Sequence, residues 1–154
     1  MPDFRSRLRN GAPILLNAAT GTEMQRRGAD TRLPLWSARA LVDAPDLVLE
    51  IHREEIAAGA DVLTANTFRT HRRTLAKDRL GERSRELTAL AVHLARNAAA
   101  SSGRDVLVAG SQSPLEDCYR PDLIPEDLAL EREHREQAES LAAAGVDLIL
   151  LETH

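Results

Sequence analysis

The sequence predicts an α/β fold in which parallel strands alternate with helices, and a recurring pattern supports this prediction. A glycine, one further residue, an aspartate and two aliphatic residues start at Gly59, Gly103 and Gly145, and a looser copy starts at Gly11. The copies lie roughly 45 residues apart, which is the length of one strand-and-helix unit. Parallel strands joined by helices follow from this repeat, with the polar residues after each strand at one edge of the sheet.

Each copy of the pattern opens a short apolar run of the kind that forms a buried strand. Four such units are half of an eight-stranded barrel, so residues 1–154 are expected to form the N-terminal half of a TIM-type (β/α)8 barrel, as a single truncated domain. Because little sequence follows the last run, its strand is expected to lack a covering helix. The four expected strands are residues 13–16, 62–64, 106–109 and 148–151.

Helix signals fill the intervals between these runs. After the first run, Thr20 or Thr22 is expected to cap a helix that ends near Gly28. Asp43 is expected to be the N-cap of the next helix, with Pro45 in its first turn. Helices often end at a residue in the left-handed conformation, which only glycine adopts freely, so this helix is expected to stop at Gly59.

Two later helices are expected in the second half of the chain. An amphipathic pattern with apolar residues on one face starts at Leu87, and Pro125 precedes a helix that runs to Gly145. The long segment 115–125 lies between them and is expected to be a loop with a function, such as a lid.

Three local features admit two interpretations each. His52 and Glu55 lie close together but lack the spacing of a metal-binding His-Glu-x-x-His helix, so residues 52–55 are expected to be a solvated helix face. The basic segment 69–73 can meet an anionic group, but such a cluster usually stays in water. Trp36 is expected either to anchor packing or to wall a pocket.

Composition excludes several classes of protein. The net charge is −4 with 29% charged residues, which gives no basic footprint for nucleic acid. No apolar run reaches membrane-spanning length, and the N-terminus lacks the apolar core of a signal peptide. A single cysteine, Cys118, precludes an internal disulfide and fits a reducing compartment. A cytoplasmic location is therefore expected.

An ordered set of segments resembles the N-terminal half of the homocysteine S-methyltransferase family of zinc-dependent (β/α)8 barrels. The resemblance covers nearly the whole chain, and its specificity comes from the order and spacing of the segments together. The segments are 17–23 with 27–28, 35–38, 58–61 through 66–68, 109–111, and 144–147 through 151–153.

The resemblance implies transfer of a methyl group from a sulfonium or betaine-type donor to the homocysteine thiol, giving methionine. It implies that Glu152 holds the substrate ammonium by a charge-assisted hydrogen bond. The family usually has Asp-Gly where this chain has Asn17-Ala18, so one negative charge is missing there. The substrate-binding residues implied by the resemblance are Asn17, Ala18, Thr20, Asn66, Thr67, Phe68 and Glu152.

The same resemblance implies zinc in the complete barrel, bound by cysteines of the C-terminal half. Cys118 does not match one of those positions, so no zinc is expected to bind to this chain alone, no catalytic residue is assigned within it, and the chain alone is expected to be inactive. Two hypotheses remain open at this stage. The chain is either the substrate-binding half of a methyltransferase or a non-catalytic half-barrel that pairs with itself or with a partner barrel.

Overall fold

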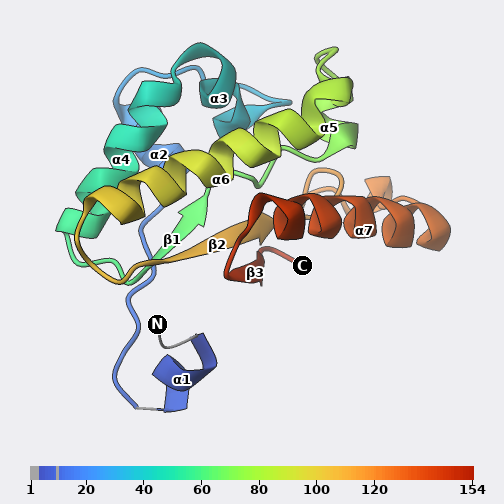
Figure 1. Cartoon of the computed structure of the whole chain (residues 1–154). Coiled ribbons are helices and arrows are strands. Elements are labelled where there is room, and N and C mark those ends of the chain that lie inside the picture. The colour runs from blue at the N-terminus through green and yellow to red at the C-terminus, as the bar shows by residue number, and fades with distance from the viewer. Residues whose placement is uncertain (1–3, 10) are drawn as a thin grey trace.

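The computed structural model describes residues 4–9 and 11–154, and helices make up most of this part of the chain (Figure 1). The α-helices are α1 (Phe4–Arg9), α2 (Thr20–Arg26), α3 (Ala40–Asp43), α4 (Pro45–Ala57), α5 (Arg72–Ala76), α6 (Ser84–Ser101) and α7 (Asp127–Ala144). Short 3-10 helices are η1 (Trp36–Arg39), η2 (Gly81–Arg83) and η3 (Pro121–Leu123). The strands are β1 (Val62–Ala65), β2 (Leu107–Gln112) and β3 (Leu148–Leu151).

The strands form a parallel sheet in the order β1-β2-β3, which confirms the predicted α/β class. Residue Leu63 pairs with Val108, and Gly110 pairs with Ile149. Strand β2 continues beyond the expected end at residue 109, because Ser111 and Gln112 pair with residues of β3. A parallel neighbour supplies hydrogen bonds to the polar end of the strand, which the residue pattern alone does not show.

The expected first strand, residues 13–16, is reduced to one isolated parallel bridge between Leu16 and Val62 in the described chain. Pro13 has no N–H to give to a ladder. The N–H of Leu15 donates to the side chain of Asp61, at 3.0 Å, instead of to a backbone carbonyl. The prediction of four regular strands was therefore wrong for the first one, although its segment does lie beside β1.

The aspartates of the repeated pattern have a common structural role at two of its copies. Asp61 accepts the N–H of Leu15, and Asp147 accepts the N–H of Val108 at 2.7 Å. In both cases the carboxylate at the start of one strand bonds the backbone of the preceding strand segment. At these two copies, the aspartate of the repeat therefore joins a strand to its neighbour.

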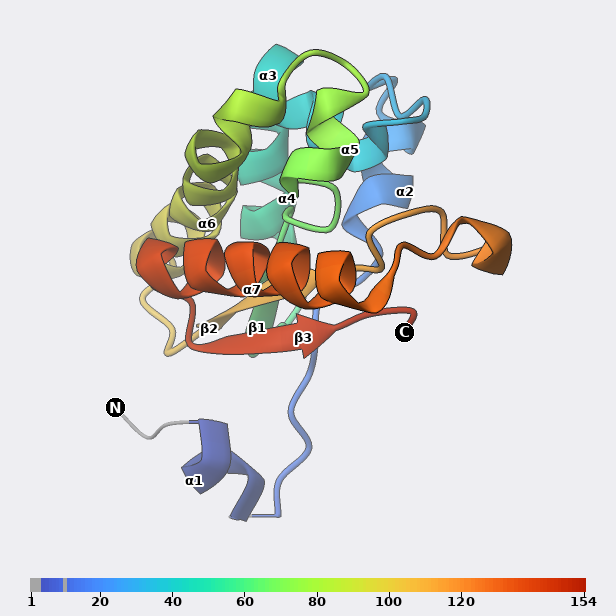
Figure 2. The same cartoon turned by 90° about the vertical axis from the view of Figure 1, so that its right-hand side faces the viewer.

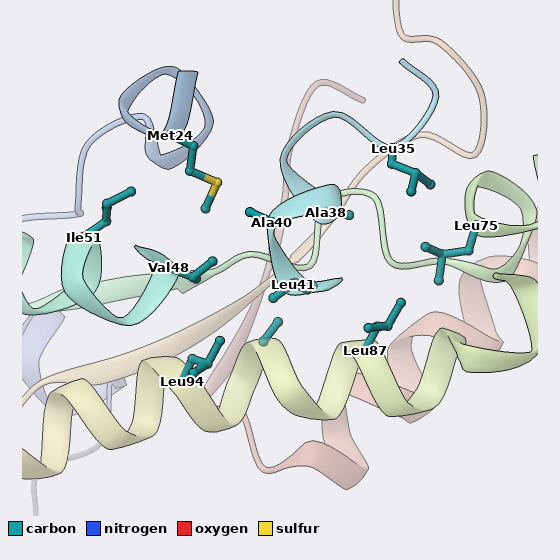
Figure 3. Packing of buried hydrophobic residues seen from close by; sticks show 11 residues of the cluster. Met24, Leu35, Ala38, Ala40, Leu41, Val48, Ile51, Leu75, Leu87 and Leu94 are labelled. Carbon is teal, nitrogen blue, oxygen red and sulfur yellow. The ribbon is translucent and has the colours of Figure 1, made fainter. Parts of the chain in front are cut away.

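Helices α4, α6 and α7 lie on one side of the sheet, as the two views show (Figures 1 and 2). A cluster between the sheet and these helices includes Leu63, Val108 and Leu141. A second cluster joins α2, α3, α4 and α6 and includes Met24, Leu41 and Leu87 (Figure 3). These two clusters form the core that holds the strand ends in place.

The opposite side of the sheet carries a smaller apolar cluster. Val62, Leu107 and Ala109 are buried there, and Phe4 of α1 packs against them. Arg7 of α1 also forms an ion pair with Asp105 at 2.8 Å. Helix α1 is thereby attached below the sheet, at the end remote from the strand carboxyl termini (Figure 2).

Helix ends follow the expected glycines more closely than the expected caps. Helix α7 ends with Gly145 at φ 84°, and Gly59 just after α4 has φ 113°. The N-cap of α4 is Ala44 rather than Asp43, and neither α4 nor α2 has a side-chain cap hydrogen bond, so the predicted caps were wrong. None of the described helices has the length and apolar character needed to cross a membrane.

The edge strand β3 is incompletely covered. Ile149 is 39% exposed and Leu151 is 65% exposed, both on the side of the sheet where Gly110 meets α7. Leu15 and Leu16, at the other edge, are also exposed. Aliphatic side chains at both edges are thus available for contact with further structure.

Candidate functional site

A pocket of about 530 Å³ opens at the carboxyl ends of the strands. Its lining includes Ala65 at the end of β1, Ser111 of β2 and Glu152 directly after β3. The turn after Leu16 and the long segment before α7 complete the wall. Parallel strands bring their carboxyl ends to one edge, so side chains distant in sequence meet there.

Six of the seven residues implied by the resemblance line this pocket: Asn17, Ala18, Thr20, Asn66, Phe68 and Glu152. Thr67 does not line it; its side chain is buried, and the hydroxyl donates to the carbonyl of Ser111 at 2.8 Å. Thr67 therefore connects the ends of β1 and β2, a position that supports the pocket from outside its surface.

The side chain of Asn17 is held by groups on both sides. Its Oδ1 accepts the backbone N–H of Thr64 at 2.8 Å. Its Nδ2 donates to a carboxylate oxygen of Glu55 at 2.9 Å and lies 3.2 Å from the hydroxyl of Thr20. An amide uses its acceptor end and its donor end in this arrangement, which an aspartate could not do.

The side chain of Asn66 is fixed in a similar way. Its Nδ2 donates to the carbonyl of Ser37 at 2.8 Å, and the residue is buried. Ser37 belongs to η1, so the end of β1 is tied to the segment that carries Trp36. This contact sets the distance between the strand ends and the aromatic wall of the pocket.

The carboxylate of Glu152 accepts a hydrogen bond from the hydroxyl of Ser111. The backbone N–H of Glu152 donates to the carbonyl of Gln112 at 3.0 Å. Glu152 is half-buried, and no ion pair to it occurs within the described part of the chain. Its carboxylate therefore keeps acceptor capacity for a donor within the pocket.

Trp36 walls the pocket, one of its two expected roles. Its ring meets that of Phe68 edge-on, with centroids 5.7 Å apart. A Cβ placed on Gly21 would lie 2.5 Å from Trp36 Cζ2, so the bare glycine lets the indole lie against α2. The aromatic pair gives one side of the pocket an apolar surface.

Two interpretations were open for the basic segment 69–73, contact with an anionic group or solvation, and solvation was wrong for Arg69, Thr70 and His71, which are buried. Arg69 lines the pocket, and its guanidinium lies 5.2 Å from the ring centroid of Phe68. The residue pattern allowed this segment to meet an anionic group but did not single out Arg69 as a pocket residue. Its position directly after the strand-end residues 66–68 was the available signal.

Contacts from the same segment hold the loop 115–125 in place. Arg73 bonds both carboxylate oxygens of Glu133 on α7, each at 2.7 Å, and lies 3.3 Å from Glu116. Lys77 also pairs with Glu116. The loop then brings Asp117, Cys118 and Tyr119 to the pocket wall. The loop therefore lies at the pocket, and its function as a lid stays a prediction.

The pKa of His71 is lowered to about 3, mainly by burial and also by the positive charge of Arg69. The imidazole is neutral at pH 7, with Nε2 3.0 Å from the hydroxyl of Thr74. His71 accepts the N–H of Thr74 and so caps α5. It is a structural group beside the pocket.

Residues 52–55 were expected to be solvated, and the structure contradicts this for His52 and Glu55. His52 is 0% exposed, and its Nδ1 lies 3.6 Å from a carboxylate oxygen of Glu55. Arg53 and Glu54 are exposed, as expected. His52 and Glu55 therefore belong to the side of α4 that packs against the turn at Asn17.

No group of three or more His, Cys, Asp or Glu that could hold a metal occurs among residues 4–9 and 11–154. The residues described here therefore do not fit the zinc that the resemblance implies. Zinc would need ligands from outside this part of the chain.

The structure defines an α/β protein with a parallel sheet and a pocket at the strand carboxyl ends, which is where (β/α)-barrel proteins have their sites. The family model described as Homocysteine S-methyltransferase matches residues 14–154. The chain belongs to the homocysteine S-methyltransferase family.

Curated relatives agree with this assignment. A homocysteine S-methyltransferase of Escherichia coli K12 is 34% identical over 153 residues, covering 91% of this chain and 49% of the relative. A selenocysteine methyltransferase of Astragalus bisulcatus is 31% identical over 172 residues, covering 92% of this chain and 50% of the relative. The chain spans about half the length of the curated relatives that it matches.

Solved structures give the same result. The metallated form of the homocysteine methyltransferase MmuM from E. coli matches with a TM-score of 0.83 at 34% identity. This match covers 96% of the present chain and 56% of that structure. The apo form of the same enzyme matches with a TM-score of 0.66 at 29% identity. The fold described here therefore corresponds to about half of a barrel.

Proposed function

We propose that this chain supplies the amino-acid-binding half of a homocysteine S-methyltransferase. The acceptor is homocysteine, and the donor is a small sulfonium or betaine-type molecule. In the reaction a bond forms between the acceptor sulfur and the methyl carbon as the donor's bond to that carbon breaks. The thiol proton passes to solvent, and the products are methionine and the demethylated donor. A cytoplasmic location keeps such a thiol reduced.

The observation that carries this proposal is the position of Glu152 in the pocket. Its carboxylate, held by Ser111, lies at the same edge of the sheet as Asn17 and Asn66. A carboxylate there suits a substrate ammonium, because hydrogen bonds to an ionised partner are roughly twice as strong as neutral ones. The apolar wall of Trp36 and Phe68 suits the methylene groups of the same substrate.

This chain's own residues bind and orient the amino-acid end of the substrate in this proposal. Deprotonation of the thiol by zinc would depend on ligands from the remaining half of the barrel, because the described residues do not provide such a site. We therefore propose that methyl transfer needs that second half. The exposed Leu15 and Leu151 at the two edges support association with it or, in its absence, with a second copy of the chain.

The test is a binding titration of homocysteine followed by the fluorescence of Trp36, the single tryptophan of the chain. Glu152→Gln keeps the shape of the side chain but removes the charge. We expect it to weaken homocysteine binding by about 1.5–3 kcal/mol, about ten-fold or more. Glu139→Gln, at an exposed position of α7 remote from the pocket lining, is the matched control. Unchanged affinity with a lower melting temperature in Glu152→Gln would show that Glu152 is a structural residue.

A further inference from the structure

Arg69 is a buried cation in the wall of the pocket. It is 8% exposed, and its Nε is buried without a hydrogen-bond partner. Its Nη1 donates to the backbone carbonyl of Glu116 at 3.3 Å, a long hydrogen bond, and its guanidinium lies over the ring of Phe68. No acidic side chain pairs with Arg69 within residues 4–9 and 11–154.

Arg73, four residues further along the chain, differs from Arg69 because its guanidinium is paired with acidic side chains. It forms a two-pronged pair with Glu133 and also contacts Glu116. A guanidinium has five N–H donors, and leaving a buried charge unpaired is costly. Arg69 therefore lines the pocket with a guanidinium that has N–H donors not accepted by any described residue.

The pocket lining also contains acidic residues, and these would repel an anion. Glu152 and Asp117 are the acidic residues of the lining, and Oδ1 of Asp117 accepts the N–H of Tyr119 at 3.0 Å. Glu152 and Arg69 lie on different strand ends, after β3 and after β1 respectively. The lining of the pocket thus contains both a carboxylate and a guanidinium.

We propose that Arg69 binds the carboxylate of the substrate, so that the pocket recognises an amino acid as a zwitterion. This inference rests on the proposed function and adds to it the group that recognises the substrate's negative end. Guanidinium and carboxylate are planar and form two parallel hydrogen bonds, so this residue would select ligands that carry a carboxylate. The carboxylate can belong to the methyl acceptor or to an amino-acid sulfonium donor.

The first test compares ligands on the unmodified chain by the fluorescence of Trp36. Homocysteine is compared with 3-aminopropane-1-thiol, which lacks the carboxylate, and with 4-mercaptobutanoate, which lacks the ammonium. S-methylmethionine and its decarboxylated sulfonium form the donor pair. We expect removal of the carboxylate to weaken binding at least ten-fold in one pair, and that pair identifies whether the acceptor or the donor uses Arg69.

The second test uses variants. Arg69→Gln should weaken the carboxylate-bearing ligand at least ten-fold and leave its decarboxylated analogue unchanged. Arg69→Lys keeps the charge without the fork geometry and should recover part of the affinity. Arg72→Gln removes an equal charge from an exposed side chain of the same segment, which pairs with Glu82 and does not line the pocket, and it should not alter the preference for a carboxylate.

The outcomes separate this inference from the proposed function. Binding of both homocysteine and S-methylmethionine that is insensitive to the carboxylate and to Arg69→Gln would overturn the role of Arg69 and leave the proposed function standing. Binding of 4-mercaptobutanoate through Arg69 without binding of homocysteine would support Arg69 and overturn the proposed acceptor. If no carboxylate-bearing ligand gives a saturable signal with the folded chain, the role of Arg69 is refuted. The comparison on the unmodified chain holds even if Arg69→Gln fails to fold.

Discussion

The side-chain amide of Asn17 donates a 2.9 Å hydrogen bond to the carboxylate of Glu55 and so joins the turn after the first strand segment to α4. At its other end, Asn17 accepts the N–H of Thr64 in β1. The resemblance to the family implies an aspartate at the position of Asn17. In this chain an aspartate would put two carboxylates in contact, so Asn17 and Glu55 are matched to one another.

The first prediction tests this matching. Asn17→Asp should lower the free energy of unfolding at pH 7 by about 1–3 kcal/mol, because a hydrogen bond to a charged group is replaced by repulsion. Adding Glu55→Gln should restore most of the loss, since Gln offers an N–H to the new carboxylate. Urea unfolding of the two single variants and the double variant measures the coupling. Additive effects would mean that the two side chains do not interact.

The second prediction concerns the close approach of Gly21 and Trp36. Gly21→Ala gains about 0.5–1 kcal/mol of helix propensity in α2 but puts a Cβ 2.5 Å from the indole. Overpacking costs about 1–3 kcal/mol, so the clash should dominate and displace Trp36 from the pocket wall. We expect a shifted tryptophan emission and a lower melting temperature. Thr22→Ala, at the exposed next position, should change neither.

The third prediction is a loss of stability in mild acid caused by His71. Its pKa is about 3 in the folded chain, below the usual 6.5, because it is buried and lies near the charge of Arg69. As pH falls below about 6.5, His71 takes up a proton in the unfolded state but stays neutral in the folded state. Stability present above pH 6.5 should therefore be lost at up to about 1.4 kcal/mol per pH unit as pH falls toward 3.

His71→Asn tests this assignment, because it keeps a side-chain acceptor for the N–H of Thr74 but does not titrate. The slope of unfolding free energy between pH 6.5 and 5 should become shallower. His134, whose pKa is lowered by burial and by His154, should account for part of the remaining slope. His93→Asn, at an exposed site on α6, is the control. An unchanged slope in His71→Asn would count against a neutral, buried imidazole.

The fourth prediction concerns the exposed edge of the sheet. Leu151 is 65% exposed on β3, and we expect the isolated chain to self-associate through this edge. Leu151→Lys should shift sedimentation toward a monomer. Leu128→Lys, at an 82% exposed position at the start of α7, should leave the association unchanged. A monodisperse monomer in the unmodified chain would contradict this expectation.

Much of the site could be predicted from sequence because parallel topology constrains where strand ends lie. Once residues 62–64 and 148–151 are identified as strands, Asn66 and Glu152 must come to the same edge of the sheet. The pocket does bring them together. Thr67 shows the limit of this reasoning. It lies between Asn66 and Phe68 in the sequence, but its side chain bonds the carbonyl of Ser111 and does not line the pocket.

The sequence by itself determined the parallel α/β class and the edge of the sheet that carries the polar residues, because the repeated glycine and aspartate pattern is local. Only the tertiary structure decided which polar side chains are buried and with what partners. Arg69 bonds the backbone of Glu116, 47 residues further along the chain, and the half-buried Asn17 is paired with Glu55 of α4. Burial and pairing come from contacts between distant segments, and no local pattern contains them.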